Sequence, residues 1–290
     1  MRVVRRADEL ERVPRAVVVG TFDGVHRGHH RVIEAADEAG LRTTVVTFHP
    51  HPRTILGNRV ELLTSIERRL ELIGALGVAE TLLIEFSLDV AALPAEEFAE
   101  SVLRRIGAEV VVAGDGFRFG RGAAGNLALL AELGFETRTV PIVDGVSSSA
   151  VRRLLKAGDV RDAAALLGRS AEVEGIVVLG DQRGGTLGFP TANLAVEADL
   201  LVPAYGIYAG AAGDRRAAVS IGTNPHYGGE ERRVEAFLLD FDGDLYGKRL
   251  RVELWERLRD EQTFATEAEL VAAIRADVER ARAASPPPPA

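Results

Sequence analysis

The spacing of apolar residues changes once along this chain, near Gly168, and the change separates two unlike parts. Before Gly168, short apolar segments alternate with stretches such as 66–76 and 95–106, where apolar residues recur at helical spacing. Strands that alternate with helices predict βαβ units and a parallel sheet. The predicted strands of this part are residues 16–20, 43–48, 81–86, 109–113 and 135–141.

After Gly168 the apolar spacing approaches two, and closely spaced strands follow one another without intervening helices, which predicts a small antiparallel β-barrel. A helix predicted at 267–282 closes this part. We therefore predict an α/β domain over residues 1–168, a β-barrel domain over 169–284, and a disordered or polyproline-like tail at 285–290. The predicted barrel strands are 172–179, 206–211, 217–221, 232–241 and 249–255.

Composition excludes several classes of protein. The 290 residues contain no cysteine, which rules out disulfides, thiolate zinc sites and cysteine nucleophiles. No apolar run is long enough to cross a bilayer, so we expect a cytoplasmic protein with no membrane partner. The formal charge of −8 argues against a nucleic-acid partner bound through its phosphates. Because 33 of the 35 basic residues are arginine, arginine, backbone N–H groups and metal ions would have to hold any phosphate.

The sharpest local signal is a glycine-containing turn directly after the predicted strand at 16–20, before a helical pattern at 30–39. A strand, a tight turn and a helix N-terminus together form an anion-binding site. Neither the dinucleotide GxGxxG motif nor a lysine-bearing P-loop is present. We predict that phosphate or nucleotide binds at this turn, whose candidate binding residues are Gly20, Thr21, Phe22, Asp23 and Gly28.

Two histidines of the same turn, His26 and His29, are candidate catalytic residues. They could donate hydrogen bonds to a phosphate and stabilise the charge that develops in adenylyl transfer, which depends on positioning and electrostatics. A histidine in this region could instead cap a loop or lie on the surface, and we prefer that interpretation for His30. A zinc site is the other alternative, but the motif contains no cysteine and no obvious carboxylate partner.

These residues resemble the HxGH nucleotidyltransferases, and specifically the adenylyltransferase module of bacterial bifunctional riboflavin kinase/FAD synthetases. The resemblance continues at 47–53, 114–120 and 146–152. It implies a Rossmann-like nucleotidyltransferase domain, in which Arg152 binds nucleotide phosphates rather than lying idle on a helix surface. One position departs from the family, which usually has Asn or Asp where this chain has Gly116. Loss of one neutral hydrogen bond costs on the order of 1 kcal/mol, so we expect weakened rather than abolished adenylyl transfer.

The second part carries its own phosphate signal at residues 183–193, a glycine-rich loop that ends in Pro-Thr-Ala-Asn. On an extended backbone Thr191 and Asn193 point the same way. Their oxygens suit Mg²⁺ bound to nucleotide phosphates, because this ion takes few protein ligands and keeps its waters. We predict that Gly188, Thr191 and Asn193 bind nucleotide and that Thr191 and Asn193 bind the metal. The alternative is a loop whose asparagine caps a turn.

Glu235 is the candidate catalytic base of the second part. In the predicted strand 232–241, alternation places it on the face of Phe237, Leu239 and Phe241. A carboxylate on an apolar face is costly to bury without a role. A general base that deprotonates a substrate hydroxyl would explain it, whereas an exposed strand edge is the alternative.

This second set is similar to the riboflavin kinase module of the same family. There the Pro-Thr-Ala-Asn segment binds Mg²⁺ and phosphates, and a strand glutamate activates the flavin ribityl hydroxyl. The resemblance includes 222–225 and 244–247, and Leu258-Arg259 followed by Phe264, which implies that Arg259 and Phe264 bind flavin. Three positions depart from the usual residues, namely Gly185, His226 and Tyr227.

The resemblance covers residues 15 to 282 and implies an enzyme that phosphorylates riboflavin to FMN and adenylylates FMN to FAD. It implies ATP as co-substrate, Mg²⁺ as cofactor, and riboflavin and FMN as small-molecule partners. One alternative is a riboflavin kinase with a degenerate first domain. Another is a flavin-binding regulator or storage protein without chemistry. The sequence makes no prediction of oligomeric state.

Overall fold

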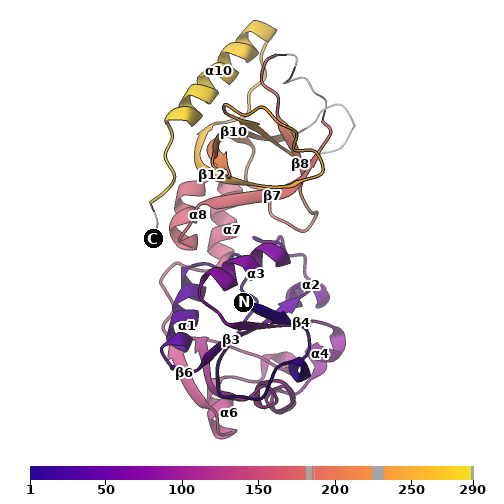
Figure 1. Cartoon of the computed structure of the whole chain (residues 1–290), viewed down its shortest axis with the longest axis vertical. Helices are drawn as coiled ribbons and strands as arrows, with labels where there is room; N and C mark the ends of the chain where they lie inside the picture. The colour runs from indigo at the N-terminus through magenta and orange to yellow at the C-terminus, as the bar shows by residue number, and fades with distance from the viewer. Residues whose placement is uncertain (181–184, 186, 224–231, 289–290) are drawn as a thin grey trace. The chain divides into compact units, whose positions relative to one another are not determined.

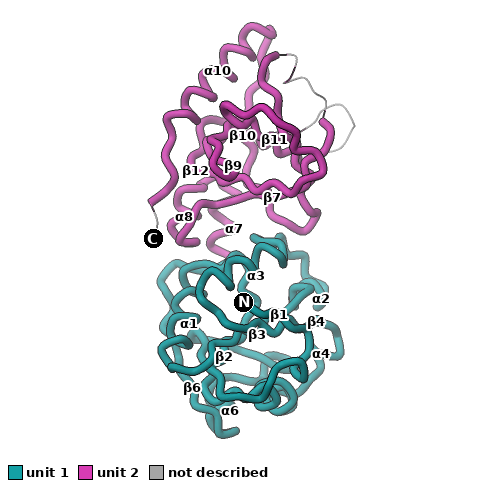
Figure 2. The backbone as a smooth tube through the Cα atoms, viewed as in Figure 1, with its two compact units in different colours: residues 1–148 teal, residues 149–290 magenta. Residues whose placement is uncertain are grey.

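A computed structural model describes residues 1–180, 185, 187–223 and 232–288 (Figure 1). The chain divides into two compact units, residues 1–148 and 149–290 (Figure 2). The helices α7 (Ser148–Ala157) and α8 (Val160–Leu167) thus lie almost entirely in the second unit. The functional boundary that the sequence predicts at residue 168 stays a prediction.

The first unit is built on a six-stranded sheet in the order β1-β4-β3-β2-β5-β6, with every neighbouring pair parallel. This confirms the predicted α/β class. The sequence did not predict β1, a short edge strand. The strands are β1 (Arg2–Val4), β2 (Arg15–Val19), β3 (Arg42–His49), β4 (Glu80–Glu85), β5 (Ala108–Gly114) and β6 (Glu136–Val140).

Helices cover both faces of this sheet. Alternate residues of β2 enter opposite apolar clusters, with Val17 and Val19 on one face and Ala16 and Val18 on the other. Burial on both faces explains why residues 16–19 of this strand are all apolar. The helices α1 (Arg27–Asp37) and α3 (Ile66–Ala75) pack on the Ala16 face. The opposite face carries α5 (Ala95–Phe98), its π-helical continuation η2 (Ala99–Arg104) and α6 (Leu127–Glu132).

Shorter helical segments complete the unit. They are η1 (Ala7–Glu9), α2 (Pro52–Ile55), α4 (Leu88–Ala92) and η3 (Arg121–Ala123). The chain passes from β2 to β3 on one side and later returns to place β5 on the other side of β2. The carboxyl ends of β2 and β5 therefore form a topological switch point, the place where open α/β sheets bind ligands.

The second unit contains a closed antiparallel barrel in the order β10-β11-β8-β7-β12-β9, as predicted. Before the barrel, α8 ends at Gly168 in a left-handed conformation (φ 77°), which explains why a glycine stands at the change of pattern. The strands are β7 (Ala171–Val178), β8 (Ala192–Ala195), β9 (Gly206–Ala212), β10 (Arg215–Thr223), β11 (Arg232–Leu238) and β12 (Arg249–Arg259).

The C-terminal helix α10 (Glu267–Ala283) packs on the outer face of the barrel, against β9 and β10. Its residue Ala281 joins an apolar cluster with Ala209, Ala211 and Trp255. Arg282 forms an ion pair of 2.6 Å with Asp240, which follows β11. These contacts confirm the predicted closing helix.

Candidate active sites

A pocket lies at the carboxyl ends of β2 and β5, at the switch point of the sheet. Residues 141–143 after β6 form part of its wall, together with Gly114 at the end of β5. Six of the residues that the sequence singled out line this pocket: Gly20, Thr21, Phe22, His26, Gly28 and His29. The fold therefore gathers most of the predicted phosphate site around one cavity.

The two histidines lie stacked, with ring centroids 3.7 Å apart and an angle of 14° between the planes. The backbone N–H of His26 donates to Nδ1 of His29 at 3.2 Å, at the N-terminus of α1. Because Nδ1 accepts this bond, a neutral His29 carries its proton on Nε2, where it can donate to a ligand. A Cβ atom at Gly28 would lie 3.1 Å from Cε1 of His26, so the glycine leaves room for the ring.

The turn before α1 has an uncommon backbone. Phe22 (φ 51°), Gly24 (φ 81°) and Val25 (φ 39°) all lie in the left-handed region, which is costly for the two non-glycine residues. The carboxylate of Asp23 is 1% exposed and accepts the backbone N–H groups of Leu63 at 2.9 Å and Thr64 at 3.3 Å. The Asp23 carboxylate thus fixes the turn against the segment before α3, and Asp23 is not among the residues that line the pocket.

Arg152, the remaining predicted phosphate ligand of the first site, lies on α7 in the second compact unit. Its predicted role stays a prediction. Within the first unit, the hydroxyl of its last residue, Ser148, donates to the carbonyl of Asp23 at 2.9 Å, in the histidine turn (residues 20–29).

In the barrel, the structure brings together the three residues predicted for phosphoryl transfer. Glu235 of β11 pairs with Asn193 of β8 in the strand register. The Thr191 hydroxyl donates to Oε2 of Glu235 at 3.2 Å. The Asn193 amide packs so closely on Gly180 that a Cβ atom there would lie 2.4 Å from it. Asn193 therefore lies against the chain just before the glycine-rich loop.

The environment of Glu235 differs in part from the prediction. Val234, Ala236 and Leu238 are buried, while Glu235 and Phe237 occupy the other, half-buried face of β11. The predicted continuation of that face through Leu239 and Phe241 is wrong, because β11 ends at Leu238 and Asp240 takes a left-handed conformation (φ 54°). Glu235 is thus reachable from outside the barrel and has polar neighbours in Thr191 and Asn193.

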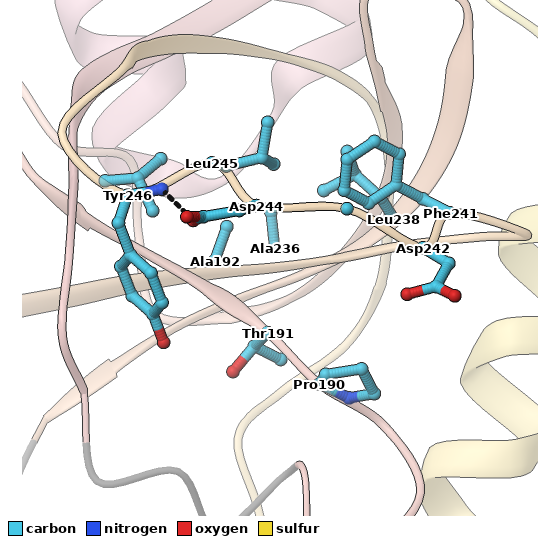
Figure 3. A pocket seen from close by; sticks show the side chains of 12 residues that line it. Pro190, Thr191, Ala192, Ala236, Leu238, Phe241, Asp242, Asp244, Leu245 and Tyr246 are labelled. Carbon is cyan, nitrogen blue, oxygen red and sulfur yellow. Dashed lines mark hydrogen bonds between the residues drawn. The ribbon is translucent and has the colours of Figure 1, made fainter.

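A second pocket opens beside this group, between the start of β8 and the segment that follows β11. Figure 3 shows Thr191 and Pro190 on one side, with Tyr246 on one flank and Asp242 on the other. The backbone N–H of Tyr246 donates to the Asp244 carboxylate at 2.8 Å, which folds residues 241–246 into a wall. Thr191 belongs both to this pocket and to the contact with Glu235.

The two predicted flavin ligands are neighbours at the end of β12. The Arg259 guanidinium lies 5.7 Å from the ring centroid of Phe264. Nε of Arg259 donates to Asp277 on α10 at 3.0 Å, and Nη2 donates to the same carboxylate at 2.7 Å. Sequence reasoning missed Asp277, although an acidic residue on the buried face of a helix is a signal that it needs a partner.

For some of the predicted site residues the structure gives few or no contacts. Gly188 has φ 87° with open space around it. Parts of the glycine-rich loop (183, 184 and 186) and residues 224–227 lie outside the described residues. Across the described parts of the chain, no three His, Cys, Asp or Glu side chains are grouped so as to hold a metal ion.

Comparison with known proteins shows which family the sequence matches. A family model described as riboflavin kinase matches residues 167–285, and one described as FAD synthetase matches residues 9–152. Proteins named bifunctional riboflavin kinase/FMN adenylyltransferase are 33% identical in Listeria monocytogenes (95% of this chain, 94% of that protein) and 34% identical in Escherichia coli (97% of each). The chain belongs to this family.

A further member of the family, from Pseudomonas fluorescens, is 35% identical over 99% of both chains. A solved structure described as a macrolide-efflux protein from Streptococcus pneumoniae has a TM-score of 0.88 and 31% identity, covering 98% of this chain and 99% of that one. Among the helices of the described residues, none has the length and apolar content needed to cross a membrane.

Gly116 follows β5 with φ 80°, and nothing lies within 4 Å of the position that a Cβ atom would occupy. Asparagine is the side chain that best tolerates this left-handed conformation. The backbone at Gly116 therefore has a conformation that an asparagine could adopt.

Proposed function

We propose that this chain makes FAD in two ATP-dependent steps, with one step in each domain. The barrel transfers the γ-phosphoryl group of ATP to riboflavin, giving FMN and ADP. The N-terminal domain then joins the AMP part of a second ATP to FMN and releases pyrophosphate. One observation carries the proposal: the riboflavin kinase and FAD synthetase models match separate segments of a chain whose full-length relatives are named for both activities.

In the kinase step, Glu235 is proposed to accept the proton of the riboflavin 5′-hydroxyl as its oxygen attacks the γ-phosphorus. The new O–P bond forms while the bond to the β-phosphate oxygen breaks, and ADP leaves. The hydrogen bond from Thr191 orients the carboxylate for this task. Arg259 and Phe264, held together at the end of β12, are proposed to bind the flavin.

Mg²⁺ is the proposed metal of this step. The hydroxyl of Thr191 and the amide oxygen of Asn193 are neutral oxygen donors beside a carboxylate, which fits the preference of Mg²⁺ for oxygen ligands. When bound, the ion would neutralise phosphate charge on ATP. Gly188 is proposed to allow the glycine-rich loop to approach those phosphates.

In the adenylyl step, an FMN phosphate oxygen attacks the α-phosphorus of ATP and pyrophosphate leaves. The N-terminus of α1 faces the pocket with its partial positive charge, and Nε2 of His29 can donate to the phosphate. We propose that His26 and His29 stabilise the transition-state charge, and that the pocket residues Gly20, Thr21, Phe22 and Gly28 bind the nucleotide. The proposed roles of Asp23 and Arg152 at this site are to support the turn and to bind phosphate.

We further propose that the functional domains are residues 1–168 and 169–284, and that the enzyme acts in the cytoplasm. The activity is tested by incubating the purified protein with riboflavin, ATP and Mg²⁺ and separating the flavins by chromatography. We expect FMN to appear first and FAD to follow. FMN without FAD would leave a riboflavin kinase only, and unchanged riboflavin would indicate a flavin-binding protein without chemistry.

A further inference from the structure

Arg69 is a buried arginine that lies behind the histidine turn rather than in the pocket. It belongs to α3, and its side chain is 1% exposed. A guanidinium is rarely buried so completely unless it is paired, because removing the charge from water is expensive. Arg69 is not among the residues that line the pocket, so its burial needs another explanation.

The contacts of Arg69 join the ends of two neighbouring strands. Its Nη2 atom lies 3.9 Å from Oδ1 of Asp23, in the turn that follows β2. Its Nη1 atom donates to the carbonyl of Phe48 at 3.3 Å, near the end of β3. One side chain therefore connects the histidine turn to the segment that leads into residues 49–53.

Thr64 also contacts the histidine turn. Its hydroxyl accepts the backbone N–H of Gly24 at 3.2 Å and lies 3.5 Å from the Asp23 carboxylate. The Leu63 side chain packs directly over Gly24, because a Cβ atom at that position would lie 2.6 Å from it. The left-handed backbone at Phe22, Gly24 and Val25 thus rests on contacts from the segment before α3 and from α3 itself. Strained backbone of this kind persists only when its surroundings fix it.

We infer that Arg69 is a positioning residue for adenylyl transfer. Through Asp23 it holds the turn in its left-handed conformation, and that conformation sets where His26 and His29 stand at the start of α1. The inference rests on the proposed adenylyl transfer. It assigns a role to a residue that does not line the pocket and that no motif of the sequence indicated.

The test measures FAD formation from supplied FMN, ATP and Mg²⁺ in an Arg69→Met variant, which keeps much of the side-chain volume and removes the charge. Misplaced histidines would lose transition-state contacts more than ground-state binding. We expect kcat to fall at least tenfold while the KM for ATP changes less than threefold. Riboflavin kinase activity of the same protein should stay within twofold. Arg68→Met is the matched control, since Arg68 pairs with Glu71 on the same helix at 2.9 Å, and it should leave both reactions within twofold.

A double-mutant cycle separates positioning from general damage. If Arg69 acts through the histidines, Arg69→Met should change the residual FAD rate of a His29→Ala protein by less than threefold, because residues that act as a unit are not additive. An equal loss in both backgrounds would contradict the inference. So would a folded Arg69→Met protein with kcat within twofold of the unsubstituted enzyme.

If Arg69→Met does not fold, Thr64→Val tests whether the contacts behind the histidine turn affect FAD formation. This near-isosteric change removes only the hydroxyl that supports Gly24 and Asp23, and we expect a threefold to tenfold loss of kcat for FAD formation. An unchanged kcat would overturn the inference. Absence of FAD formation by the unsubstituted protein would instead contradict the proposed function, and this role with it.

Discussion

The hydroxyl of Thr191 donates a hydrogen bond of 3.2 Å to the carboxylate of Glu235, which lies 44 positions further along the chain. The pairing of Glu235 with Asn193 in the register of β8 and β11 makes this contact possible. It brings a candidate base next to two candidate metal ligands, one of which also lines the adjacent pocket. The arrangement allows proton removal and phosphate binding at one place.

Glu235→Gln is predicted to lower the rate of FMN formation at least a hundredfold, because an amide of the same shape accepts no proton. General-base catalysis contributes typically about 10²–10⁴-fold. Conversion of supplied FMN to FAD should stay within twofold, since Glu235 lies in the barrel. Chromatography of the flavins measures both rates, and Glu267→Gln in the exposed first turn of α10 serves as a control. Persistent FMN formation by a folded Glu235→Gln protein would remove Glu235 from the mechanism.

His29→Ala is predicted to have the opposite effect. Loss of a hydrogen-bond donor to the transition state should lower the rate of FAD formation by about 10²–10³-fold, as measured for comparable donors in other enzymes. Riboflavin phosphorylation should remain within twofold. Arg31→Ala is the control on the same helix, because the Arg31 side chain is 69% exposed and is not among the residues that line the pocket. Loss of both activities in a folded His29→Ala protein would contradict independent sites.

Gly116→Asn is predicted to improve FAD formation. The position is open and has φ 80°, so an asparagine enters without a clash and at the lowest conformational cost of any non-glycine side chain. One added hydrogen bond of about 1 kcal/mol corresponds to roughly a fivefold lower KM for ATP. Steady-state kinetics of FAD formation measures the change. Gly116→Ala is the control, because it brings the backbone strain without the amide, and it should show no gain.

Asp277→Ala is predicted to weaken both the fold of the barrel and flavin binding. It leaves the Arg259 guanidinium, 19% exposed, without the carboxylate that it contacts through two nitrogen atoms. We expect the free energy of unfolding to fall by about 2 kcal/mol, the scale of a charged hydrogen-bonded pair. The KM for riboflavin should rise, since Arg259 loses its fixed position beside Phe264. Denaturant unfolding and kinase kinetics give the two readouts, and an unaltered KM would argue against a flavin-binding role for Arg259.

Alkaline pH is predicted to destabilise the barrel through Tyr208. Burial raises the pKa of its hydroxyl, which donates to the Ala204 carbonyl at 2.6 Å. The folded state therefore keeps this proton after the unfolded chain has lost it, so stability is unaffected below a pH of about 10 and falls as the pH rises further. Tyr208→Phe should reduce this alkaline loss while costing about 1 kcal/mol at neutral pH. Unfolding midpoints at neutral and alkaline pH test the prediction, and an equal alkaline loss in both proteins would contradict it.

The fold class could be predicted from the sequence because its signals are local. In the buried parallel strand β2, the four residues after Arg15 are a continuous apolar run, and the closely spaced barrel strands lack helices between them. Short strands cannot be predicted from such local signals. The three residues of β1 and the four of β8 are too few to show a period in apolar spacing, and the sequence predicts β8 only as the end of a glycine-rich loop.

The candidate sites were predictable to different extents. The turn from Gly20 to His29 carries its chemistry in adjacent residues, so its lining of one pocket could be expected from the motif and the strand before it. The wall formed by residues 241–246 could not be, because it depends on where β11 ends. Asp277 was missed because its partner Arg259 lies 18 positions away on another element.

By itself, the sequence determined that two candidate phosphate-binding segments follow each other, one after a buried parallel strand and one at the start of a barrel. Local periodicity and motif spacing are sufficient for that. Only the tertiary structure decided that Thr191 touches Glu235 and that Arg69 contacts both Asp23 and Phe48. Such contacts depend on strand register and helix packing between distant segments, and the energy that fixes them comes from burial of the assembled core rather than from neighbouring residues.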